Sequence, residues 1–475
     1  MTDAFQIAVD RAARAPIAIQ IHGAIRDAIQ DGRLGAGARL PSWRDLAAQL
    51  GVARGTVQVA YARLIDEQLL VAAGAAGTRV ADRIVARPAA DRAVERPPLP
   101  GLFHDFGAMP LPFQMGVPAQ DAFPLKIWSR MMVRGARAAA AAPVSYPDPR
   151  GHPDLRREIA AYLALARGIS CTPDQILITA GYFGALGLAL QALRLQRSVA
   201  WLEDPGFPLT RAALGLGGVE VVAVPVDADG IDVAEGIRRA PHAALAVVTP
   251  GQQAPLGMKL SLARRLALLE WARASGAWIV EDDYLSELQL EGRAAPALAS
   301  LDRDGRVLHI GTFSKTISPA LRLGFLVAPP PLAALFGDAA ACLAPAPSSA
   351  VQRTVAEFMA GGHYLRHLRH MKRLYAMRRQ MLVKSLQKAM GTPDGIRSVG
   401  GLAVRIDVPA GADDQEIATR ALSFGLSPVP MTPWYAAPPP VGGLLLCVTN
   451  LVERRLDQDC SRLLDLVAQS AATAR

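Results

Sequence analysis

The chain has 475 residues, more than a single hydrophobic core usually serves, so we expect at least two domains, one of them large. Hydrophobic residues make up 51% of the sequence and charged residues 20%, a balance that excludes an intrinsically disordered protein. The formal net charge of +9 suits a polyanionic partner, but charge alone does not distinguish nucleic acid from an anionic membrane.

The N-terminus and the cysteines indicate the compartment. The N-terminal segment MTDAFQIAVDRAAR contains acidic residues and no long apolar core, unlike a secretory signal or a transit peptide. The four cysteines are far apart and form neither a metal-binding pair nor a dense disulfide framework. The most membrane-like stretch, residues 176–193, is interrupted by glycines, which favours a buried strand and helix. We therefore expect a cytoplasmic protein that does not enter a membrane.

The first predicted elements are three helices. Apolar side chains recur at positions 17, 21, 25 and 29, which predicts an amphipathic helix over residues 17–32. In LPSWRDLAAQLGVARGTVQVAYARLIDEQLL, Ser42 can cap a second helix, Gly51 can make a turn, and a third helix begins near Arg54. The start of the third helix is poor in acidic residues, as a helix that enters the major groove of DNA requires. The following VAAGAAGTRVAD predicts a hairpin wing.

Residues 16–81 resemble the winged helix-turn-helix of the GntR regulators, in GRLGAGARLPSWRDLAAQLGVARGTVQVAYARL and in GTRVA. The resemblance implies that double-stranded operator DNA is a partner. The residues that it places at phosphates, base edges or the wing tip are Arg44, Arg54, Thr56 and Gly77. The family often has a wing arginine where this chain has Ala73, and Arg79 can take its place. The alternative for the arginines is a set of solvated charges at helix ends.

A proline-rich segment, residues 83–112, is typical of a stiff linker. It separates a domain of residues 1–82 from one of residues 113–475. In the second, short apolar runs alternate with helical patterns, which predicts an α/β fold with a mostly parallel sheet buried on both faces. These runs are residues 175–179, 199–202, 219–224, 244–249, 277–281, 307–310 and 325–327. Two further runs, residues 402–408 and 444–448, predict a small C-terminal α+β subdomain.

The segment HIGTFSKTISPALRLGFLVAP, residues 309–329, combines three polar features. A predicted strand ends in a hydroxyl-rich turn with Thr312 and Lys315, and Arg322 follows. An aldehyde cofactor needs a lysine amine for a Schiff base, and its phosphate needs hydroxyl donors and a permanent cation. A lone lysine is more often a solvated surface charge, but burial after an apolar strand lowers the pKa of the amine and favours imine formation.

Two other strands end in groups that suit the same cofactor. In SGAWIVEDDYLSEL, Asp282 can keep a pyridine nitrogen protonated and Tyr284 can approach the ring oxygen, although such an acidic run is by itself more often a solvated loop. In ILITAGYFGALGLAL, a helix opens with free N–H groups at Tyr182 and Phe183 that can bind a phosphate. Phe207 in WLEDPGFPLT can stack on the ring, and an ordinary core aromatic is an equally good explanation.

Residues 113–475 resemble the fold-type-I aminotransferases, and their fusion to a GntR reader resembles the MocR/GabR regulators. The resemblance implies pyridoxal 5'-phosphate (PLP) as the cofactor and a homodimer as the assembly. The roles that it assigns are the Schiff base for Lys315, the pyridine nitrogen for Asp282, the ring hydroxyl for Tyr284, the phosphate for Thr312 and Arg322, and the neighbouring subunit's phosphate for Tyr146 in SYPDPRG.

Two departures from the aminotransferase pattern concern ligand binding. Ala254 stands where aminotransferases have the asparagine of N-P-T-G, so Tyr284 alone is left for the ring oxygen. Leu445 stands where R-L-G-F often supplies an arginine for a substrate carboxylate. Either another cation replaces it, with Arg211 and Arg405 as candidates, or the ligand lacks an α-carboxylate. We expect an amine with a different acidic group, such as a sulfonate, or PLP itself.

These features predict a PLP-dependent transcription regulator, and not an enzyme, whose aminotransferase-like domain senses an amine, an amino compound or PLP itself. The alternative is a catalytically active aminotransferase with an accessory DNA-binding domain, and the missing carboxylate arginine argues against efficient turnover of common amino acids. A nucleoid-type binder that relies on basic surface alone would have no use for Lys315.

Overall fold

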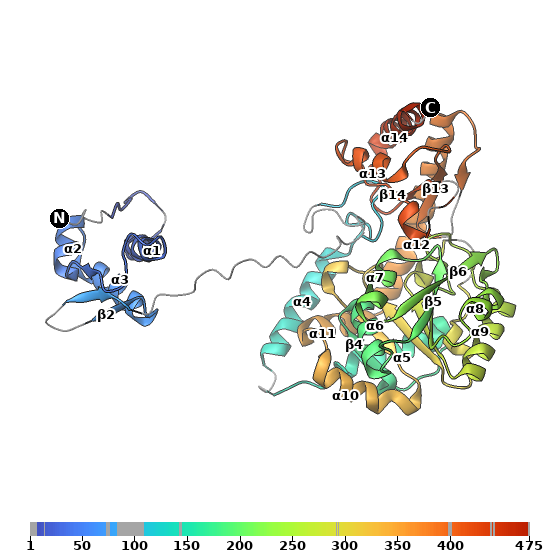
Figure 1. Cartoon of the computed structure of the whole chain (residues 1–475), viewed down its shortest axis with the longest axis horizontal. Helices are drawn as coiled ribbons and strands as arrows, with labels where there is room; N and C mark the ends of the chain where they lie inside the picture. Colours follow the sequence, from blue (N-terminus) through green and yellow to red (C-terminus); the bar gives the residue numbers. More distant parts are fainter. Residues whose placement is uncertain are drawn as a thin grey trace. The chain divides into compact units, whose positions relative to one another are not determined.

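The computed structural model describes residues 7–13, 15–72, 77–82, 109–141, 145–290, 292, 294–397, 401–437, 439 and 442–473. The chain divides into two compact units, Met1–Pro97 and Pro98–Arg475, and each is described by itself (Figure 1). The division falls within the segment predicted as a linker, residues 83–112, of which residues 83–108 lie outside the described part.

Three helices form the body of the small unit. They are α1 (Ile17–Gln30), α2 (Trp43–Leu50) and α3 (Arg54–Asp66). The Ser42 hydroxyl caps α2 by accepting the Asp45 N–H at 3.1 Å. Gly51 ends α2 with a φ of 61°, a left-handed conformation that glycine adopts without steric cost. The apolar stripes of the three helices meet in one core. Its buried helical members include Ile21, Ile25, Ile29, Leu46, Val57, Tyr61 and Leu64.

A small antiparallel sheet with the strand order β1-β3-β2 completes this unit. Its strands are β1 (Arg39–Leu40), β2 (Leu70–Ala72) and β3 (Thr78–Val80). Strands β2 and β3 form the predicted wing hairpin, with Leu70 opposite Val80, and its tip, residues 73–76, lies outside the described part. The helices and the hairpin confirm the predicted winged helix-turn-helix.

An eight-stranded sheet with the order β4-β11-β10-β9-β8-β5-β6-β7 forms the centre of the large unit. The strands are β4 (Ile176–Thr179), β5 (Val199–Asp204), β6 (Glu220–Asp227), β7 (Gly230–Ile231), β8 (Leu245–Val248), β9 (Trp278–Asp283), β10 (Val307–Thr312) and β11 (Gly324–Val327). Strands β10, β9, β8, β5 and β6 are parallel. Because β11 is antiparallel to both β10 and β4, β4 runs in the same direction as β10. The mostly parallel sheet confirms the predicted α/β fold.

Helices cover both faces of this sheet, as the strand β8 illustrates. Leu245 and Val247 pack into a core with α6 (Gly181–Ala192) and α10 (Ala333–Leu343), whereas Ala246 and Val248 pack into another with α8 (Val233–Arg239) and α9 (Leu262–Ser275). Alternate residues of a strand thus enter different cores, which explains why the strands are apolar throughout. The helices of this layer system are α4 (Leu125–Ala140), α5 (Pro153–Arg167), α6 (Gly181–Ala192), α7 (Pro208–Leu216), α8 (Val233–Arg239), α9 (Leu262–Ser275), α10 (Ala333–Leu343) and α11 (Ser349–Ala360).

The C-terminal part forms the predicted smaller subdomain, drawn in orange and red in Figure 1. Its antiparallel sheet has the order β12-β13-β15-β14. The elements are α12 (His363–Met390), β12 (Ile396–Arg397), β13 (Ala403–Asp407), α13 (Asp414–Leu422), β14 (Val429–Pro430), β15 (Gly443–Cys447) and α14 (Leu456–Thr473).

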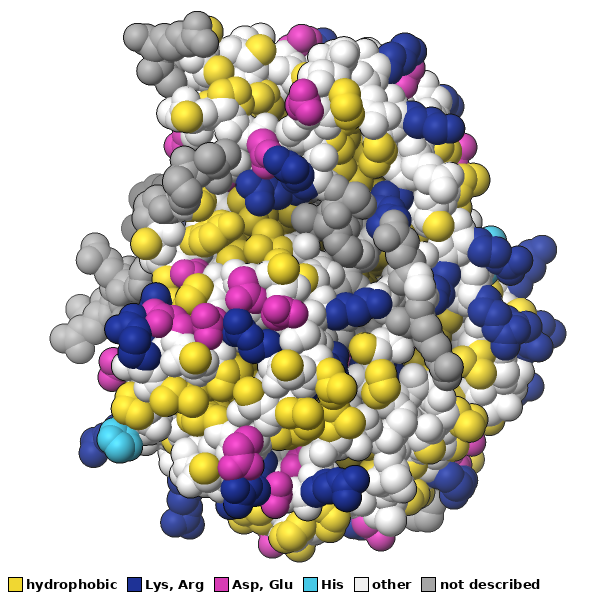
Figure 2. Space-filling view, turned by 90° about the vertical axis from the view of Figure 1, so that its right-hand side faces the viewer, with side chains coloured by type: hydrophobic (Ala, Val, Ile, Leu, Met, Phe, Trp, Pro, Cys, Tyr) yellow, Lys and Arg dark blue, Asp and Glu magenta, His cyan; other side chains and the backbone are white. Residues whose placement is uncertain are grey.

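The most membrane-like stretch, residues 176–193, is β4 followed by α6, as predicted. Within the described part of the chain, no helix is long and apolar enough to cross a membrane. On the face that Figure 2 draws, acidic and basic side chains are interspersed with apolar ones, which is the usual surface of a globular domain.

Candidate functional site

The predicted cofactor residues follow strands that end at one edge of the large sheet. Strands β4, β5, β9 and β10 all run in the same direction, so their carboxyl ends lie at the same edge. In open α/β sheets, ligands bind outside these carboxyl ends. Lys315, Asp282 and Phe207 each lie at or just beyond the end of one of these strands.

Lys315 lies three residues after β10, partly buried. Its Nζ donates a hydrogen bond to the Gly116 carbonyl at 3.3 Å. Gly116 has a φ of 91°, and a β-carbon at this position would lie 3.1 Å from the lysine Nζ. Burial lowers the pKa of Lys315, and Asp282 nearby only partly opposes this shift. A neutral amine is the form that attacks an aldehyde.

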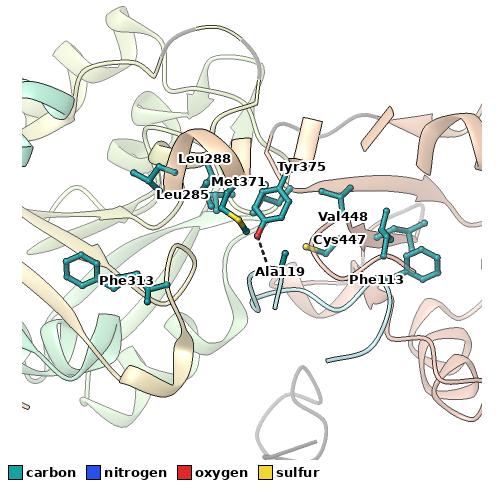
Figure 3. Close-up of a cluster of buried hydrophobic side chains, with 14 of the residues drawn as sticks. Phe113, Ala119, Leu285, Leu288, Phe313, Met371, Tyr375, Cys447 and Val448 are labelled. Carbon is teal, nitrogen blue, oxygen red and sulfur yellow. Dashed lines mark hydrogen bonds between the residues drawn. The ribbon is translucent and has the colours of Figure 1, made fainter. Parts of the chain in front are cut away.

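The segment that carries Gly116 is held by the C-terminal subdomain. The Cys447 N–H donates to the Phe113 carbonyl at 3.0 Å, and the Asn450 side chain donates to the Val117 carbonyl at 3.1 Å. The Ala119 N–H donates to the Tyr375 hydroxyl at 2.9 Å, the dashed line in Figure 3. Sequence reasoning missed this segment, because Gly116 and Lys315 are 199 positions apart and no local pattern joins them.

Asp282 is buried next to the carboxyl end of β9, and its carboxylate accepts no hydrogen bond from any described residue. Burial raises its pKa well above the ordinary value, the neighbouring Asp283 adds to the shift, and Lys315 opposes it. Tyr284 is partly buried two residues further on, and burial also raises the pKa of its hydroxyl. A buried carboxyl group without a partner is costly, so this one is suited to a donor from a ligand.

The carboxylates on either side of Asp282 point away from it into a buried network. Arg167 Nε donates to Asp283 Oδ2 at 2.7 Å, and both side chains are almost fully buried. His309 Nδ1 lies 3.0 Å from Glu281 Oε2, and although burial favours the neutral ring, Glu281 raises the pKa of His309. Each flanking acid thus has a cationic or hydrogen-bonding partner, and Asp282 is the acid of this run that remains available.

The residues predicted to bind the phosphate meet in one corner, where α6 begins. Residues Thr312 and Thr179 are both in register with Gly324 of β11. A β-carbon on Gly324 would lie 3.0 Å from the Gly181 Cα, so the absence of a side chain lets the start of α6 approach the strand. Arg322 Nη2 donates to the Ala180 carbonyl at 3.3 Å, which places its guanidinium beside the first N–H groups of α6.

Aromatic side chains line the same edge. Phe207 stacks on Phe183 with a centroid distance of 6.2 Å and packs at 5.5 Å against Trp434. The Tyr182 hydroxyl is hydrogen-bonded to Thr210 at 3.1 Å, and Asp282 is near enough to contribute to the raised pKa of Tyr182. Phe207 is only partly buried.

Tyr146 is the one predicted cofactor residue that its own chain does not bring to the site. The side chain is fully exposed, with a relative accessibility of 101%. Its predicted role requires a neighbouring subunit and stays a prediction.

The predicted DNA-contacting side chains lie on the surface of the small unit. Arg54 is exposed at the start of α3, Thr56 follows in the same turn, and that turn has no acidic residue. Arg44 is exposed, and its guanidinium lies 4.8 Å from the ring centroid of Trp43. Gly77 has a φ of 87° and leads into β3.

The residues at this edge fit a phosphate-bearing pyridine aldehyde. The site combines a lysine amine with a lowered pKa, a buried acid that has no hydrogen-bond partner among the described residues, and a helix start beside an arginine. These groups match, in that order, the aldehyde, the ring nitrogen and the phosphate of PLP. Within the described part of the chain, no group of three or more histidine, cysteine and acidic residues could hold a metal ion.

Comparison with known families agrees with both units. The model of bacterial regulatory proteins of the gntR family matches residues 18–80, and the model of aminotransferase class I and II matches residues 123–407. The protein named probable rhizopine catabolism regulatory protein MocR, from Rhizobium meliloti, is 34% identical over 455 residues, which cover 93% of this chain and 91% of that protein. The HTH-type transcriptional regulator TauR of Rhodobacter capsulatus is 35% identical over 425 residues, covering 85% of this chain and 86% of TauR.

A solved structure shows the same fold in the large unit. LysN of Thermus thermophilus, an alpha-aminoadipate aminotransferase complexed with N-(5'-phosphopyridoxyl)-L-leucine, is 25% identical, with a TM-score of 0.68 over 76% of this chain and 93% of LysN. The family match and the site residues agree on PLP as the cofactor. The chain belongs to the MocR/GabR-type regulators of the GntR family, in which a winged helix-turn-helix is joined to an aminotransferase class I and II domain.

Proposed function

We propose that this protein is a DNA-binding transcription regulator that holds PLP on Lys315 and responds to an amine, an amino compound or PLP itself. The observation that carries the proposal is the lowered pKa of Lys315 near Asp282, whose carboxylate has no hydrogen-bond partner among the described residues. The same chain also exposes a helix, α3, that is suited to the major groove of DNA. A ligand that binds two arrangements of such a protein with different affinity shifts their populations, and DNA affinity changes with them.

Each residue around the ring has one task in this proposal. When bound, PLP supplies an aldehyde and an electron-accepting ring to amines that enter the site. Lys315 attaches the cofactor, Asp282 keeps the pyridine nitrogen protonated, and Tyr284 donates a hydrogen bond to the ring hydroxyl. Phe207 packs against the ring. Asp282 suits its task because a pyridinium N–H would give the buried carboxylate the partner that it lacks.

The phosphate is assigned to a second set of groups. Thr312 and Arg322 supply a hydroxyl and a permanent cation, and Tyr182 and Phe183 supply backbone N–H groups at the start of α6. We also propose a homodimer in which Tyr146 of one protomer approaches the phosphate site of its partner. The full exposure of Tyr146 within its own chain supports this role.

Replacing Arg322 by alanine should weaken PLP retention by about 10-fold to 100-fold, because a charge-assisted contact to the phosphate contributes roughly 1.5–3 kcal/mol. Dialysis followed by quantification of bound cofactor measures the effect. Arg322→Lys keeps the charge without the fork of donors and should give an intermediate loss. Arg303, exposed in the loop before β10, provides the control Arg303→Ala, which should retain PLP fully. Full retention in Arg322→Ala would remove this residue from the phosphate site.

Replacing Arg54 by alanine should weaken binding to operator DNA by about 1–3 kcal/mol if the guanidinium makes a bidentate base contact. If Arg54 binds only phosphate, the loss should be equal on all sequences and the salt dependence should become shallower. Titrations at several salt concentrations, on the DNA upstream of the gene and on unrelated DNA, distinguish the two. Arg63 in the last turn of α3, paired with Glu67 at 3.1 Å, supplies the control Arg63→Ala. Wild-type affinity and salt dependence in Arg54→Ala would reject both modes.

A catalytically active aminotransferase with an accessory DNA-binding domain is the second candidate, and the intact arrangement of Lys315 and Asp282 favours it. The decisive experiment incubates the PLP-loaded protein with a candidate amine and follows both operator binding and the amount of amine. A regulator changes its DNA affinity while the amine is not consumed. Steady consumption of the amine with unchanged DNA affinity would favour the enzyme and overturn the proposed regulator.

A further inference from the structure

We infer that Arg39 is a further DNA-binding residue, which binds a phosphate of the DNA beside the wing hairpin formed by β2 and β3. The inference rests on the proposed function and adds a residue of β1 to its DNA-binding surface. It replaces the expectation that Arg79 takes the place of the wing arginine for which this chain has Ala73. The reason is that the guanidinium groups of Arg39 and Arg79 are directed to opposite ends of their strands.

Both arginines project from the solvent-facing side of the small sheet. Arg39 of β1 lies directly opposite Arg79 of β3. Each is exposed, and each is followed by a buried apolar residue of the core, Leu40 or Val80. Because side chains alternate between the two faces of a strand, both arginines lie on the face away from the core. Like charges directly opposite each other repel, which favours guanidinium groups that are directed apart.

Arg79 is directed away from the tip of the wing. Its Nη1 donates to the Gly37 carbonyl at 3.1 Å. The Gly37 N–H in turn donates to the Val80 carbonyl at 3.0 Å, so Gly37 lies beside the last residue of β3. The tip of the hairpin precedes the first residue of β3. A backbone carbonyl thus holds the Arg79 guanidinium at the end of the strand that is farther from the tip.

Arg39 is directed to the opposite end, next to the tip. A β-carbon on Gly77 would lie 3.3 Å from Arg39 Nε and 3.5 Å from Arg39 Nη2. Gly77 immediately precedes β3, and its φ of 87° is a conformation that favours glycine. The absence of a side chain at Gly77 therefore leaves room for the Arg39 guanidinium against the backbone of the wing.

The positive charge of Arg39 is available to a partner. Among the described residues, no acid forms an ion pair with Arg39, and no hydrogen-bond acceptor holds its guanidinium. Other arginines of the small unit are paired, namely Arg26 with Asp27, Arg33 with Asp31 and Arg63 with Glu67. An exposed guanidinium without an acid forms charge-assisted hydrogen bonds with a phosphate, and such contacts orient a protein on DNA.

The test titrates the full-length protein with the DNA upstream of its gene and with unrelated DNA of the same length, at several salt concentrations. Arg39→Ala should weaken binding to both DNAs by about 10-fold at 0.1 M salt. The slope of log affinity against log salt should become shallower by about 0.9 for each phosphate contact that is lost. Arg39→Lys keeps the charge and should bind within about threefold of the wild type, because a phosphate also binds a lysine.

Two variants are the matched controls. Arg79→Ala should keep the wild-type affinity and salt dependence, because its guanidinium is directed away from the wing tip. Arg26→Ala removes a charge of α1 that Asp27 already neutralises and should also behave as the wild type does. Circular dichroism melting of each variant reports whether the small unit is folded.

Gly77→Ala tests the contact between Gly77 and Arg39. The added methyl group would displace the guanidinium, so this change should weaken DNA binding in the wild-type background and add little to Arg39→Ala. The positive φ strains an alanine alike in both backgrounds and does not affect this comparison. Equal losses in the two backgrounds would contradict the role of Gly77 in admitting Arg39.

Wild-type affinity in Arg39→Ala would overturn the inference, and a larger loss in Arg79→Ala would identify Arg79 as the wing cation instead. A loss on the upstream DNA alone, with an unchanged salt dependence, would also overturn it, because that result indicates a base contact. In each case the proposed function would stand. If the wild type binds the upstream DNA no more tightly than unrelated DNA, the regulator proposal fails, while the phosphate contact is still measured on both DNAs.

Discussion

Replacing Lys315 by alanine is expected to abolish the covalent attachment of PLP while the fold is retained. Lys315 is the lysine at the carboxyl edge of the sheet with a lowered pKa, and its Nζ has a backbone carbonyl as its hydrogen-bond partner. The remaining groups, Asp282 and the corner at α6, would still bind the ring and the phosphate without a covalent bond. We therefore expect complete loss of the lysine-bound absorption band and much weaker retention of the cofactor.

The absorption spectrum of the purified variant measures this loss. Reduction with borohydride followed by peptide mass spectrometry identifies the attached lysine in the wild type. Lys126, exposed on α4, provides the matched control Lys126→Ala, which should keep the wild-type spectrum. Circular dichroism should be the same for both variants. A persistent lysine-bound band in Lys315→Ala would mean that another lysine holds the cofactor.

The second large effect is expected for stability. Arg167→Met should destabilise the large unit by about 3–5 kcal/mol, because it leaves the buried Asp283 carboxylate without its cation. Arg167 also donates to the Ala295 carbonyl at 2.7 Å, and this acceptor would lose its donor as well. Since Asp283 adjoins Asp282 on β9, the same change should also reduce PLP retention.

Urea unfolding followed by tryptophan fluorescence reports mainly on the large unit, because every tryptophan except Trp43 belongs to it. The control is Arg157→Met, an exposed arginine on the same helix that pairs with Asp154, and the expected cost is below about 1 kcal/mol. Adding Asp283→Asn to Arg167→Met should recover part of the loss, since no unpaired charge then remains. A cost in Arg167→Met as small as that of the control would show that Asp283 does not depend on Arg167.

Local patterns in the sequence were sufficient for the elements and for the residues that follow strand ends. The period of apolar residues in 17–32 predicted α1, and the continuous apolar runs predicted strands buried on both faces. Lys315 and Asp282 could be singled out because each follows such a run, and parallel strands place their carboxyl ends at one edge. The chemistry of the cofactor also left few residue types for each role.

The surroundings of the lysine could not be predicted in this way. That Ala254 and Leu445 depart from the aminotransferase pattern is visible in the sequence, but their membership in one cluster with Met115 and Trp434 is not. Likewise, the sequence names Arg405 as a candidate for replacing the missing arginine, but it does not reveal that the Nη2 of this residue lies 3.0 Å from Asp407. Sequence spacing does not tell which way a side chain turns on its strand.

The sequence by itself determined the two-part organisation and the fold class, and it singled out Lys315 and Asp282 as the candidates for the attachment lysine and the ring aspartate, since these depend on residue type and on short periodicities. Only the tertiary structure decided that Gly116 receives the lysine hydrogen bond, that Arg167 neutralises Asp283, and that Ala254 and Leu445 belong to one cluster with Met115 and Trp434. The physical reason is that each of these contacts joins segments more than a hundred residues apart. Which distant side chains meet is settled by the packing of the whole unit and not by any local pattern.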